Sequence, residues 1–351
     1  MKNILFISTK FKHHARVSGY DQLVAYYPNS ITIGNNELKP SLPWWSRYKW
    51  LYEFVGLKYT TNVELVHVLY GEEYLRFSPY LYGKIPVVAT FHQPPGRLEN
   101  ELRRGGSSGR VYRMTHRLTK NRFRLLSAAI VLEESQKELL SEFMPSKNIH
   151  VIYHGVNTNY FKPYKGGFDK AGQPIILTIG QWERNWEDYI KVVNLAAKIG
   201  LNWKFVVVNR NLPEEVIREL TGVNNFEYFR DASDEQLLKL YQTSKLMFLP
   251  LYSGAGNNAV MESLACGCPI VSTDVFHPNY QIRGDFIKFY TSGDIQSAIE
   301  RMKEFAQLEI GEYNQVSAKS TSFISQFDWE NIASRTAEVY SQVTASKLYN
   351  I

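Results

Sequence analysis

Short apolar segments alternate with longer amphipathic stretches along the whole chain. In the first half the apolar segments occupy residues 3–8, 64–70, 86–92, 128–132 and 149–153. In the second half they occupy residues 174–180, 204–209, 226–229, 246–251, 269–273 and 286–290. Continuous apolar runs of this length are typical of strands buried on both faces of a parallel sheet. Helical patterns lie between many of them, so the sequence predicts α/β domains built on parallel sheets.

Glycine and proline mark the boundary between the two halves. Residues 157–174 contain Pro163, Gly166, Gly167 and Gly172, which is typical of a linker. A chain of 351 residues suits two domains that each bury a core. We therefore predict a first domain over residues 1–155, a linker over 156–172 and a second domain over 173–327.

The segment that begins at residues 246–251 carries the clearest chemical signal. A turn of glycines and asparagines follows at residues 253–258, and both residue types let backbone amides approach a ligand closely. Val260 and Leu264 recur at helical spacing, so the turn begins a helix whose N-terminal N–H groups favour an anion. Glu262 lies in the first two turns, where it can accept hydrogen bonds from ligand hydroxyls. A phosphate beside a polyol indicates a nucleotide.

The same turn also satisfies a dinucleotide-binding fingerprint. Residues 254–259 read GAGNNA, and Asp274 follows 20 residues after the first glycine. That fingerprint belongs on the first strand of a dinucleotide domain, whereas about three strands of a second sheet precede it here. The first strand of the chain is followed only by a lone Gly19. An NAD-dependent oxidoreductase is therefore a minor alternative.

Several separated segments carry a family resemblance. Residues 262–271 read ESLACGCPIV, and residues 152–163 read IYHGVNTNYFKP. These segments resemble the signature and the interdomain hinge of glycosyltransferase family 4, the retaining sugar-nucleotide transferases of GT-B fold. Shorter segments at 128–140, 176–180 and 327–330 are similar to further elements of the same family.

The resemblance implies a fold and a separate binding role for each domain. The fold class is α/β: a GT-B protein whose two Rossmann-like domains have parallel sheets facing a central cleft. The N-terminal domain would bind the acceptor, and the C-terminal domain would bind the nucleotide sugar. Residues 328–351 would form a C-terminal helix that returns to the N-terminal domain.

The resemblance also implies roles for the glycine-asparagine turn and its helix. Glu262 matches the second of two glutamates that the family spaces eight residues apart, and it would hold the ribose. Gly254 stands where the first glutamate is expected, so asparagine amides would take over contacts with the sugar. The residues of the turn that would bind the nucleotide sugar are Gly254, Ala255, Gly256, Asn257 and Asn258.

A cation for the leaving diphosphate is expected after Gly180. Family members usually carry an arginine and then a lysine in this loop, but here Gln181 holds the arginine position and the lysine is absent. Arg184 keeps a positive charge within reach, and its planar fork suits phosphate oxygens. An exposed loop arginine is the alternative. Arg230, which follows the apolar segment 226–229, is a second candidate.

His92 closes a predicted strand at the carboxyl end, where open α/β sheets bind their ligands. The family places a histidine there beside the transferred sugar, so the resemblance assigns His92 to the sugar or the transition state. A structural histidine is the alternative. Gly19 resembles a loop that the family places near the diphosphate and the acceptor.

Composition narrows the class of protein further. A hydrophobic content of 44% excludes wholesale disorder, and no apolar run reaches the roughly 20 residues that span a bilayer. Cys266 and Cys268 favour packing over metal binding. No Asp-x-Asp element occurs, so we expect neither a metal nor another cofactor. Because the chain begins directly on a strand, without a signal peptide, we expect a cytoplasmic protein.

Positive charge gathers in the first half of the chain, although the whole chain carries a formal net charge of only +6. Such a basic face beside apolar residues is typical of helices that rest on an anionic membrane surface. A solvated face beside an ordinary core stripe is the alternative. No nucleic-acid module accompanies the basic residues. The cations recur at three- and four-residue steps at Arg110, Arg113, Arg117, Lys120 and Arg124, beside Val111, Met114, Leu118 and Leu125.

We therefore predict a retaining, metal-independent, hexosyltransferase-like enzyme. It would move a sugar from a nucleotide-sugar donor to a glycan or lipid-linked acceptor in cell-surface polysaccharide or glycolipid synthesis. A scaffold of the same fold that binds but has lost turnover is the alternative.

Overall fold

The computed structural model describes residues 3–8, 17–34, 49–104, 110–164, 172–254, 256–276 and 280–348. The chain divides into two compact units. Residues 1–155 together with residues 329–351 form the N-terminal unit, and residues 156–328 form the C-terminal unit.

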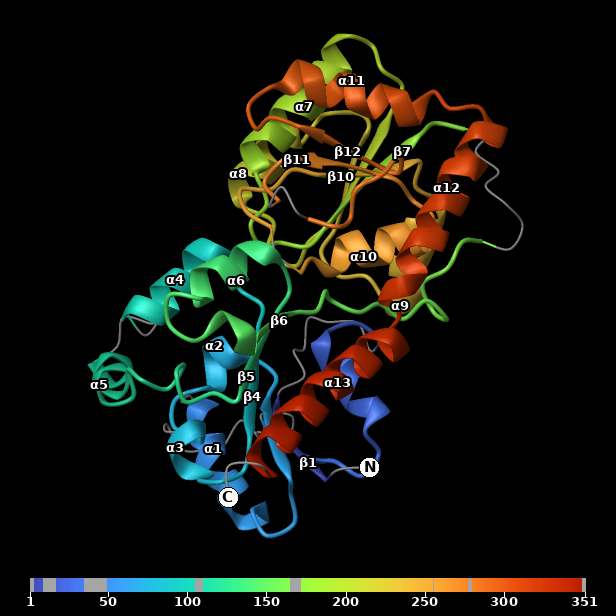
Figure 1. The fold of residues 1–351 in the computed structure, drawn as a ribbon. Coiled ribbons are helices and arrows are strands. Elements are labelled where there is room, and N and C mark those ends of the chain that lie inside the picture. Colours follow the sequence, from blue (N-terminus) through green and yellow to red (C-terminus); the bar gives the residue numbers. More distant parts are fainter. Residues whose placement is uncertain are drawn as a thin grey trace. The chain divides into compact units, whose positions relative to one another are not determined.

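A parallel sheet forms the centre of the N-terminal unit (Figure 1). Within the described residues it has six strands in the order β2-β1-β3-β4-β5-β6. Their carboxyl ends share one edge because all neighbouring pairs run parallel. The strands are β1 (Ile4–Ser8), β2 (Ile31–Gly34), β3 (Leu65–Val68), β4 (Val87–Phe91), β5 (Ala128–Val131) and β6 (Ile149–Val151).

Short 3-10 segments and α-helices of 4 to 20 residues accompany this sheet. The 3-10 segments are η1 (Tyr20–Tyr26), η4 (Lys49–Leu51), η5 (Gly56–Tyr59) and η6 (Ser146–Asn148). The α-helices are α1 (Tyr52–Val55), α2 (Gly71–Tyr74), α3 (Ser78–Leu81), α4 (Pro95–Arg104), α5 (Arg110–Leu118), α6 (Glu134–Leu140) and α13 (Trp329–Leu348).

The C-terminal unit repeats the arrangement with a second parallel sheet, in the order β12-β11-β10-β7-β8-β9. Its strands are β7 (Ile175–Ile179), β8 (Lys204–Val208), β9 (Phe226–Phe229), β10 (Leu246–Leu249), β11 (Ile270–Thr273) and β12 (Ile287–Tyr290). Its helices are α7 (Trp186–Lys198), α8 (Glu214–Leu220), α9 (Asp234–Thr243), α10 (Asn258–Ala265), α11 (Ile295–Ala306), α12 (Ile310–Ile324) and η7 (Ser325–Phe327).

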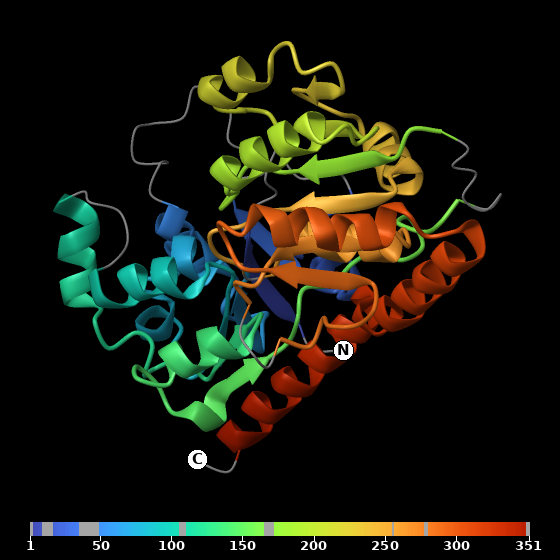
Figure 2. The ribbon, with the colours of Figure 1, turned by 90° about the horizontal axis from the view of Figure 1, so that it is seen from above.

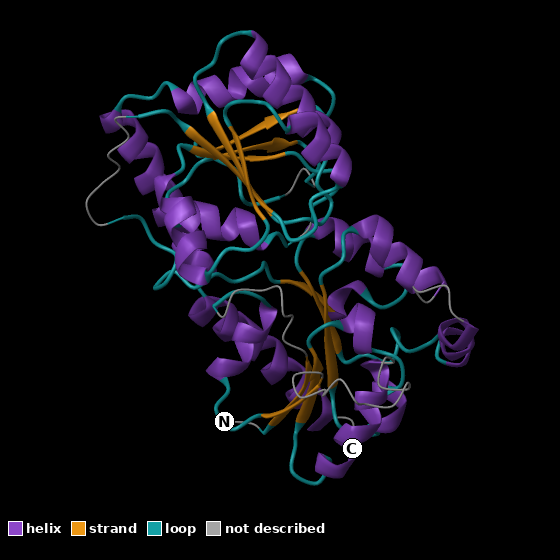
Figure 3. Cartoon of the chain, turned by 180° about the vertical axis from the view of Figure 1, so that it is seen from behind, coloured by secondary structure: helices purple, strands orange, loops and turns teal. Residues whose placement is uncertain are grey.

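Helices cover both faces of this second sheet. α7 and α11 lie on one face and α10 on the other (Figure 1). α7 runs back alongside β7, as a βα unit requires (Figure 2). Figure 3 shows helices flanking the strands in each unit. The predicted α/β class with parallel sheets is therefore confirmed.

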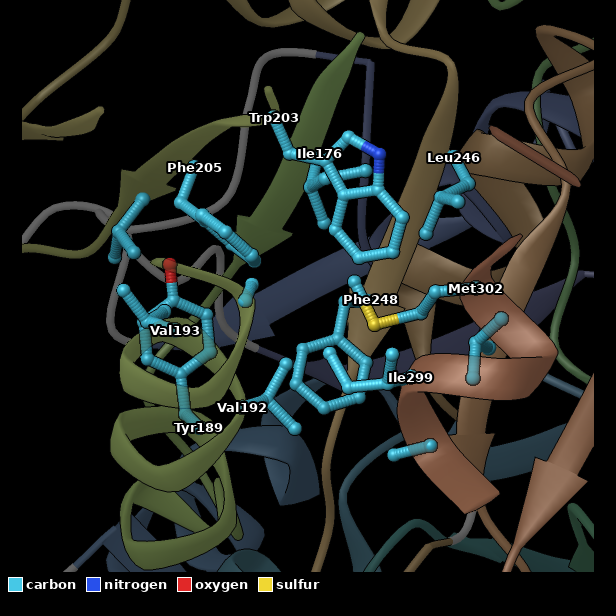
Figure 4. Packing of buried hydrophobic residues seen from close by; sticks show 14 of the residues in the cluster. Ile176, Tyr189, Val192, Val193, Trp203, Phe205, Leu246, Phe248, Ile299 and Met302 are labelled. Atoms are coloured by element: carbon cyan, nitrogen blue, oxygen red, sulfur yellow. The ribbon is translucent and has the colours of Figure 1, made fainter. Parts of the chain in front are cut away.

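The core of the C-terminal unit lies between the sheet and the pair α7 and α11 (Figure 4). Tyr189 of α7 stacks on Phe248 of β10, with ring centroids 6.1 Å apart. Apolar burial of this kind is the main favourable contribution to folding. Further members of the cluster are Ile176, Val192, Val193, Trp203, Phe205, Leu246, Ile299 and Met302.

Each apolar run that predicted a strand contains one, but β2 was missed. Its sequence, Ile31–Gly34, is short and is not a continuous apolar run. It pairs with β1 at the edge of the sheet, and only Ile33 is buried. Continuous apolar patterns reveal strands that are buried on both faces, so this edge strand gave no comparable signal.

The last helix, α13, belongs to the N-terminal unit. The Tyr340 hydroxyl lies 2.6 Å from Nδ1 of His67 on β3, and the Tyr27 hydroxyl donates to the Ala333 carbonyl at 2.8 Å. The chain enters the C-terminal unit at Val156, whose N–H donates to the Phe327 carbonyl at 3.0 Å. The expected return of the C-terminal helix to the N-terminal domain is therefore present.

Gly155 allows the start of α13 to pack against the segment after β6. A Cβ added at Gly155 would lie 2.4 Å from the Trp329 ring, which is buried. No real Cβ makes so short a contact, so one of the two segments would have to move.

We therefore expect Gly155→Ala to destabilise the N-terminal unit by about 1–3 kcal/mol through overpacking. The melting temperature in scanning calorimetry should fall by several degrees. Gly96→Ala is the matched control, because a Cβ there meets nothing within 4 Å. Equal melting of the two variants would contradict the packing role of Gly155.

Candidate functional site

Parallel pairing brings two loops of the C-terminal unit together. β7 and β10 are neighbours in the sheet, so the loops that follow them leave the same edge. The Asn185 N–H donates to the Pro250 carbonyl at 2.9 Å, and the Tyr252 N–H donates to the Glu183 carbonyl at 2.9 Å. These backbone hydrogen bonds join the loop after Gly180 to the segment before the glycine turn of α10. The sequence analysis identified the loop and the turn separately.

The turn before α10 is shaped by its glycines. Gly254 is buried, and a Cβ there would lie 2.5 Å from the Phe276 ring. Gly256 has φ of 51°, in the left-handed region that glycine adopts readily. Both positions therefore need glycine for a local reason. Ala255 lies outside the described residues.

Asn257 is the N-cap of α10, and Asn258 is the first residue of the helix. The Asn257 side-chain oxygen accepts a hydrogen bond from the Ala259 N–H at 3.0 Å. An asparagine cap of this kind satisfies a helix N–H group and fixes where the helix begins. The helix thus starts at the glycine turn, as the sequence predicts.

Glu262 is buried one turn further along α10, with 6% of its surface exposed. Its Oε2 atom accepts a hydrogen bond from the Tyr241 hydroxyl of α9 at 2.9 Å. Burial and the nearby Glu262 raise the pKa of Tyr241 well above its usual value, so the hydroxyl remains a donor. Tyr241 was not predicted, because a buried tyrosine on a helix gives no signal in the sequence until its partner is known.

Arg184 is a buried residue rather than an exposed loop arginine. Its Nε donates to the Ile179 carbonyl at 2.9 Å and its Nη1 to the Trp182 carbonyl at 2.8 Å. Burial lowers the pKa of the guanidinium to about 10, which leaves it charged at neutral pH. The side chain holds the loop around Gly180, whose φ of 88° and contact with the guanidinium leave no space for a side chain.

Glu183 carries backbone strain within this loop. Its φ of 54° is unusual for a residue with a Cβ. Such conformations persist where the surrounding structure enforces them, and they cluster at functional sites. The bonds of Arg184 to Ile179 and Trp182, on either side of Gly180, supply that enforcement here.

Arg230 is not brought to this site. It is exposed and follows β9, the edge strand, whereas the turn follows β10. β7 and β8 lie between these strands, so about three strand spacings, or roughly 14 Å, separate β9 from β10. Arg230 therefore lies apart from the glycine turn and the loop after Gly180.

In the N-terminal unit, Tyr20, the residue after Gly19, contacts His92. Gly19 has φ of 98° and immediately precedes η1, whose first residue is Tyr20. The buried Tyr20 ring lies edge-on to His92, with centroids 4.7 Å apart. His92 itself follows β4, and its backbone N–H donates to Oε1 of Glu72 at 2.9 Å. Glu72 was not predicted, because nothing in the sequence pattern relates it to His92.

The basic segment around α5 exposes apolar side chains together with its cations. Met114, Leu118 and Leu125 are 57%, 69% and 49% exposed, so they are not part of a core. The core-stripe alternative is therefore wrong for these three residues. α5 lies at the margin of the N-terminal unit, away from the sheet (Figure 1, Figure 3). The exposed cations are Arg110, Arg113, Arg117, Lys120 and Arg124.

Cys266 and Cys268 are buried and make no disulfide. The described residues contain no group of three or more His, Cys, Asp or Glu side chains placed to hold a metal ion. In the same residues, no helix is both long and apolar enough to cross a membrane.

Two family models match the chain, one in each half. Residues 17–160 match the model described as Glycosyltransferase Family 4. Residues 165–322 match the model described as Glycosyl transferases group 1. The chain has the two domains of a family 4-like glycosyltransferase. No curated protein matches it closely in sequence.

Solved structures share the fold of this glycosyltransferase. HepE of Anabaena, in complex with UDP-glucose, has a TM-score of 0.68 at 13% identity, over 97% of this chain and 100% of HepE. Sucrose-phosphate synthase of Thermosynechococcus elongatus has a TM-score of 0.72 at 15% identity, over 99% of this chain and 100% of that one. WaaG, a glycosyltransferase involved in lipopolysaccharide biosynthesis, has a TM-score of 0.67 at 12% identity, over 96% of this chain and 99% of WaaG. The fold is therefore GT-B.

We expect Arg184→Ala to destabilise the C-terminal unit of the glycosyltransferase, because buried carbonyl groups would lose their donors at a cost of about 1–3 kcal/mol. Chemical unfolding monitored by tryptophan fluorescence measures the change. Arg230→Ala removes the same side chain from an exposed edge position and should change stability by less than about 0.5 kcal/mol. Similar losses in both variants would show that Arg184 does not hold the loop.

Proposed function

We propose that the protein is a retaining glycosyltransferase that takes its sugar from a nucleotide-sugar donor without a divalent cation. The observation that carries the proposal is the β10–turn–α10 unit. It combines a glycine turn, a helix N-terminus and the buried carboxyl group of Glu262, whose Oε2 is held by Tyr241. The family 4-like domains support sugar transfer. Retention of the anomeric configuration is what the resemblance to glycosyltransferase family 4 implies.

The donor would bind along this unit. The diphosphate would lie at the turn and the start of α10, where backbone N–H groups and the helix dipole favour negative charge. Glu262 would accept hydrogen bonds from the ribose hydroxyls. Because Tyr241 fixes the carboxyl group, Glu262 would meet the ribose in a prepared orientation.

The leaving diphosphate needs positive charge as the glycosidic bond breaks. The chain has no Asp-x-Asp element, so we assign this charge to the helix N-terminus and to the buried guanidinium of Arg184. Arg184 would act from within the loop it holds. Gly180 would then allow the backbone to pass close to the phosphates. We assign His92 to the transferred sugar and Gly19 to the loop near the diphosphate.

The acceptor would be a glycan or a lipid-linked sugar in cell-surface polysaccharide or glycolipid synthesis. Likeness to WaaG, which acts in lipopolysaccharide biosynthesis, supports this class. The exposed cations and apolar side chains around α5 support peripheral contact with an anionic membrane. HepE binds UDP-glucose, so uridine diphosphate sugars are the first donors to test.

We expect Glu262→Ala to weaken binding of the donor about 10- to 100-fold, because hydrogen bonds to a charged group contribute about 1.5–3 kcal/mol. Titration calorimetry with a panel of sugar nucleotides measures this loss. Glu219→Ala is the matched control, because Glu219 is exposed on α8 in the same unit.

Wild-type affinity in Glu262→Ala would remove this residue from the site. Release of free sugar from the donor without acceptor separates an enzyme from a scaffold that only binds. A wild-type protein that binds the donor but never hydrolyses or transfers its sugar would favour the scaffold.

Reversing three exposed cations, Arg110, Arg117 and Arg124, to glutamate should release the protein from anionic vesicles. Each basic residue near such a surface contributes about 1 kcal/mol, so we expect the affinity to fall more than tenfold. Sedimentation with phosphatidylglycerol vesicles at low and high salt measures it, because salt screens the same attraction.

The matched control reverses Lys58, Lys84 and Lys147, which are exposed cations elsewhere in the N-terminal unit. It makes the same change in net charge. Met114→Ser with Leu118→Ser should weaken the binding that remains at high salt, since these side chains would enter the apolar layer. No sedimentation of the wild-type protein at either salt concentration would remove the membrane proposal.

A further inference from the structure

A buried carboxyl group lies directly beside His92. Glu72 is in α2, which follows β3, and its side chain is 4% exposed. Its Oε1 accepts the backbone N–H of His92 at 2.9 Å and lies 3.6 Å from the Nδ1 atom of the same residue. Glu72 thus contacts both the backbone and the ring of the histidine.

The imidazole of His92 is held between two aromatic rings. Tyr20 lies edge-on with its centroid 4.7 Å away, and Tyr70 lies at 4.6 Å with an angle of 30° between the rings. Within the described residues neither ring nitrogen of His92 makes a hydrogen bond, and neither does Oε2 of Glu72. Buried polar atoms without partners are costly, so their persistence here points to a ligand that engages them.

The backbone is built to bring these groups together. Gly71 begins α2, and a Cβ at this position would lie 2.8 Å from the Phe91 ring at the end of β4. Only glycine lets the start of α2 approach β4 so closely. The next residue is Glu72, and the residue after Phe91 is His92. Close packing of the two strand ends therefore places the carboxyl group against the imidazole.

We propose that Glu72 is the positioning residue of His92. Its Oε1 atom, 3.6 Å from Nδ1, favours the tautomer with the proton on Nδ1, and the two atoms form a hydrogen bond when the sugar binds. The Nε2 atom is then directed to the hydroxyl groups of the transferred sugar. The tautomer of a histidine is set by the hydrogen bond that its other nitrogen makes. A separation of 3.6 Å exceeds a hydrogen bond, and contacts of this kind commonly shorten when substrate binds. The role of Glu72 rests on the proposed function.

His67, Tyr20 and Tyr70 do not compete with Glu72 for the Nδ1 proton of His92. Burial and the nearby His92 lower the pKa of His67 to about 3, so His67 is neutral. Burial raises the pKa of Tyr20 to about 12, and burial with nearby acids raises the pKa of Tyr70 well above its usual value. These three groups keep one protonation state over the working range of pH. The carboxyl group of Glu72 can accept the Nδ1 proton in a hydrogen bond.

The test uses Glu72→Gln, which keeps an oxygen for the His92 backbone N–H but brings an amide N–H to the ring. Nitrogen NMR of protein labelled at histidine reports the tautomer, and His92→Gln assigns the signal. We expect His92 in the wild type to carry its proton on Nδ1 and in Glu72→Gln to move toward the Nε2 tautomer. We expect kcat to fall about 10- to 100-fold, with the KM for the donor changed less than threefold.

Glu73→Gln is the matched control, because Glu73 is the next residue of α2 and pairs with Lys49 instead. An unchanged His92 tautomer in Glu72→Gln, or an equal loss of kcat in Glu73→Gln, would overturn the positioning role. The NMR measurement needs no activity. A wild-type protein without sugar transfer would therefore count against the proposed function, while the tautomer would still decide the role of Glu72.

Discussion

Parallel pairing in the two sheets is the constraint on which the candidate residues depend. Parallel strands release their following loops at one edge, so residues far apart in sequence meet there. β7 and β10 are separated by two strand-helix units in the chain but are neighbours in the sheet. Their loops are joined by hydrogen bonds of Asn185 and Tyr252. The same rule brings His92, after β4, beside Glu72, after β3.

Burial of polar groups at these edges has a common pattern. Arg184, Glu262 and Glu72 are each almost fully buried. Each makes at least one hydrogen bond to a fixed backbone or side-chain group, which limits the cost of burial. Part of each polar group is thus committed to the protein, and its direction is set before a ligand arrives. Such preorganised groups stabilise developing charge without reorganising during the reaction.

The face around α5 shows the reverse, because apolar side chains are exposed there. Met114, Leu118 and Leu125 are exposed beside cations at the margin of the N-terminal unit, although each could pack into a core. Exposed apolar side chains that alternate with basic ones along the sequence suit a surface with anionic groups over an apolar layer.

The sequence by itself determined the described strands other than β2, the α/β class and the glycine turn with its helix. Continuous apolar runs and glycine at positions such as Gly256 record local physical demands, so they are visible one residue at a time. Only the tertiary structure decided which residues contact one another. Tyr241 beside Glu262, Glu72 beside His92 and the burial of Arg184 depend on which strands become neighbours, as does the distance of Arg230 from the turn. The edge strand β2 was hidden for a similar reason: its apolar pattern is weak, and its pairing with β1 defines it.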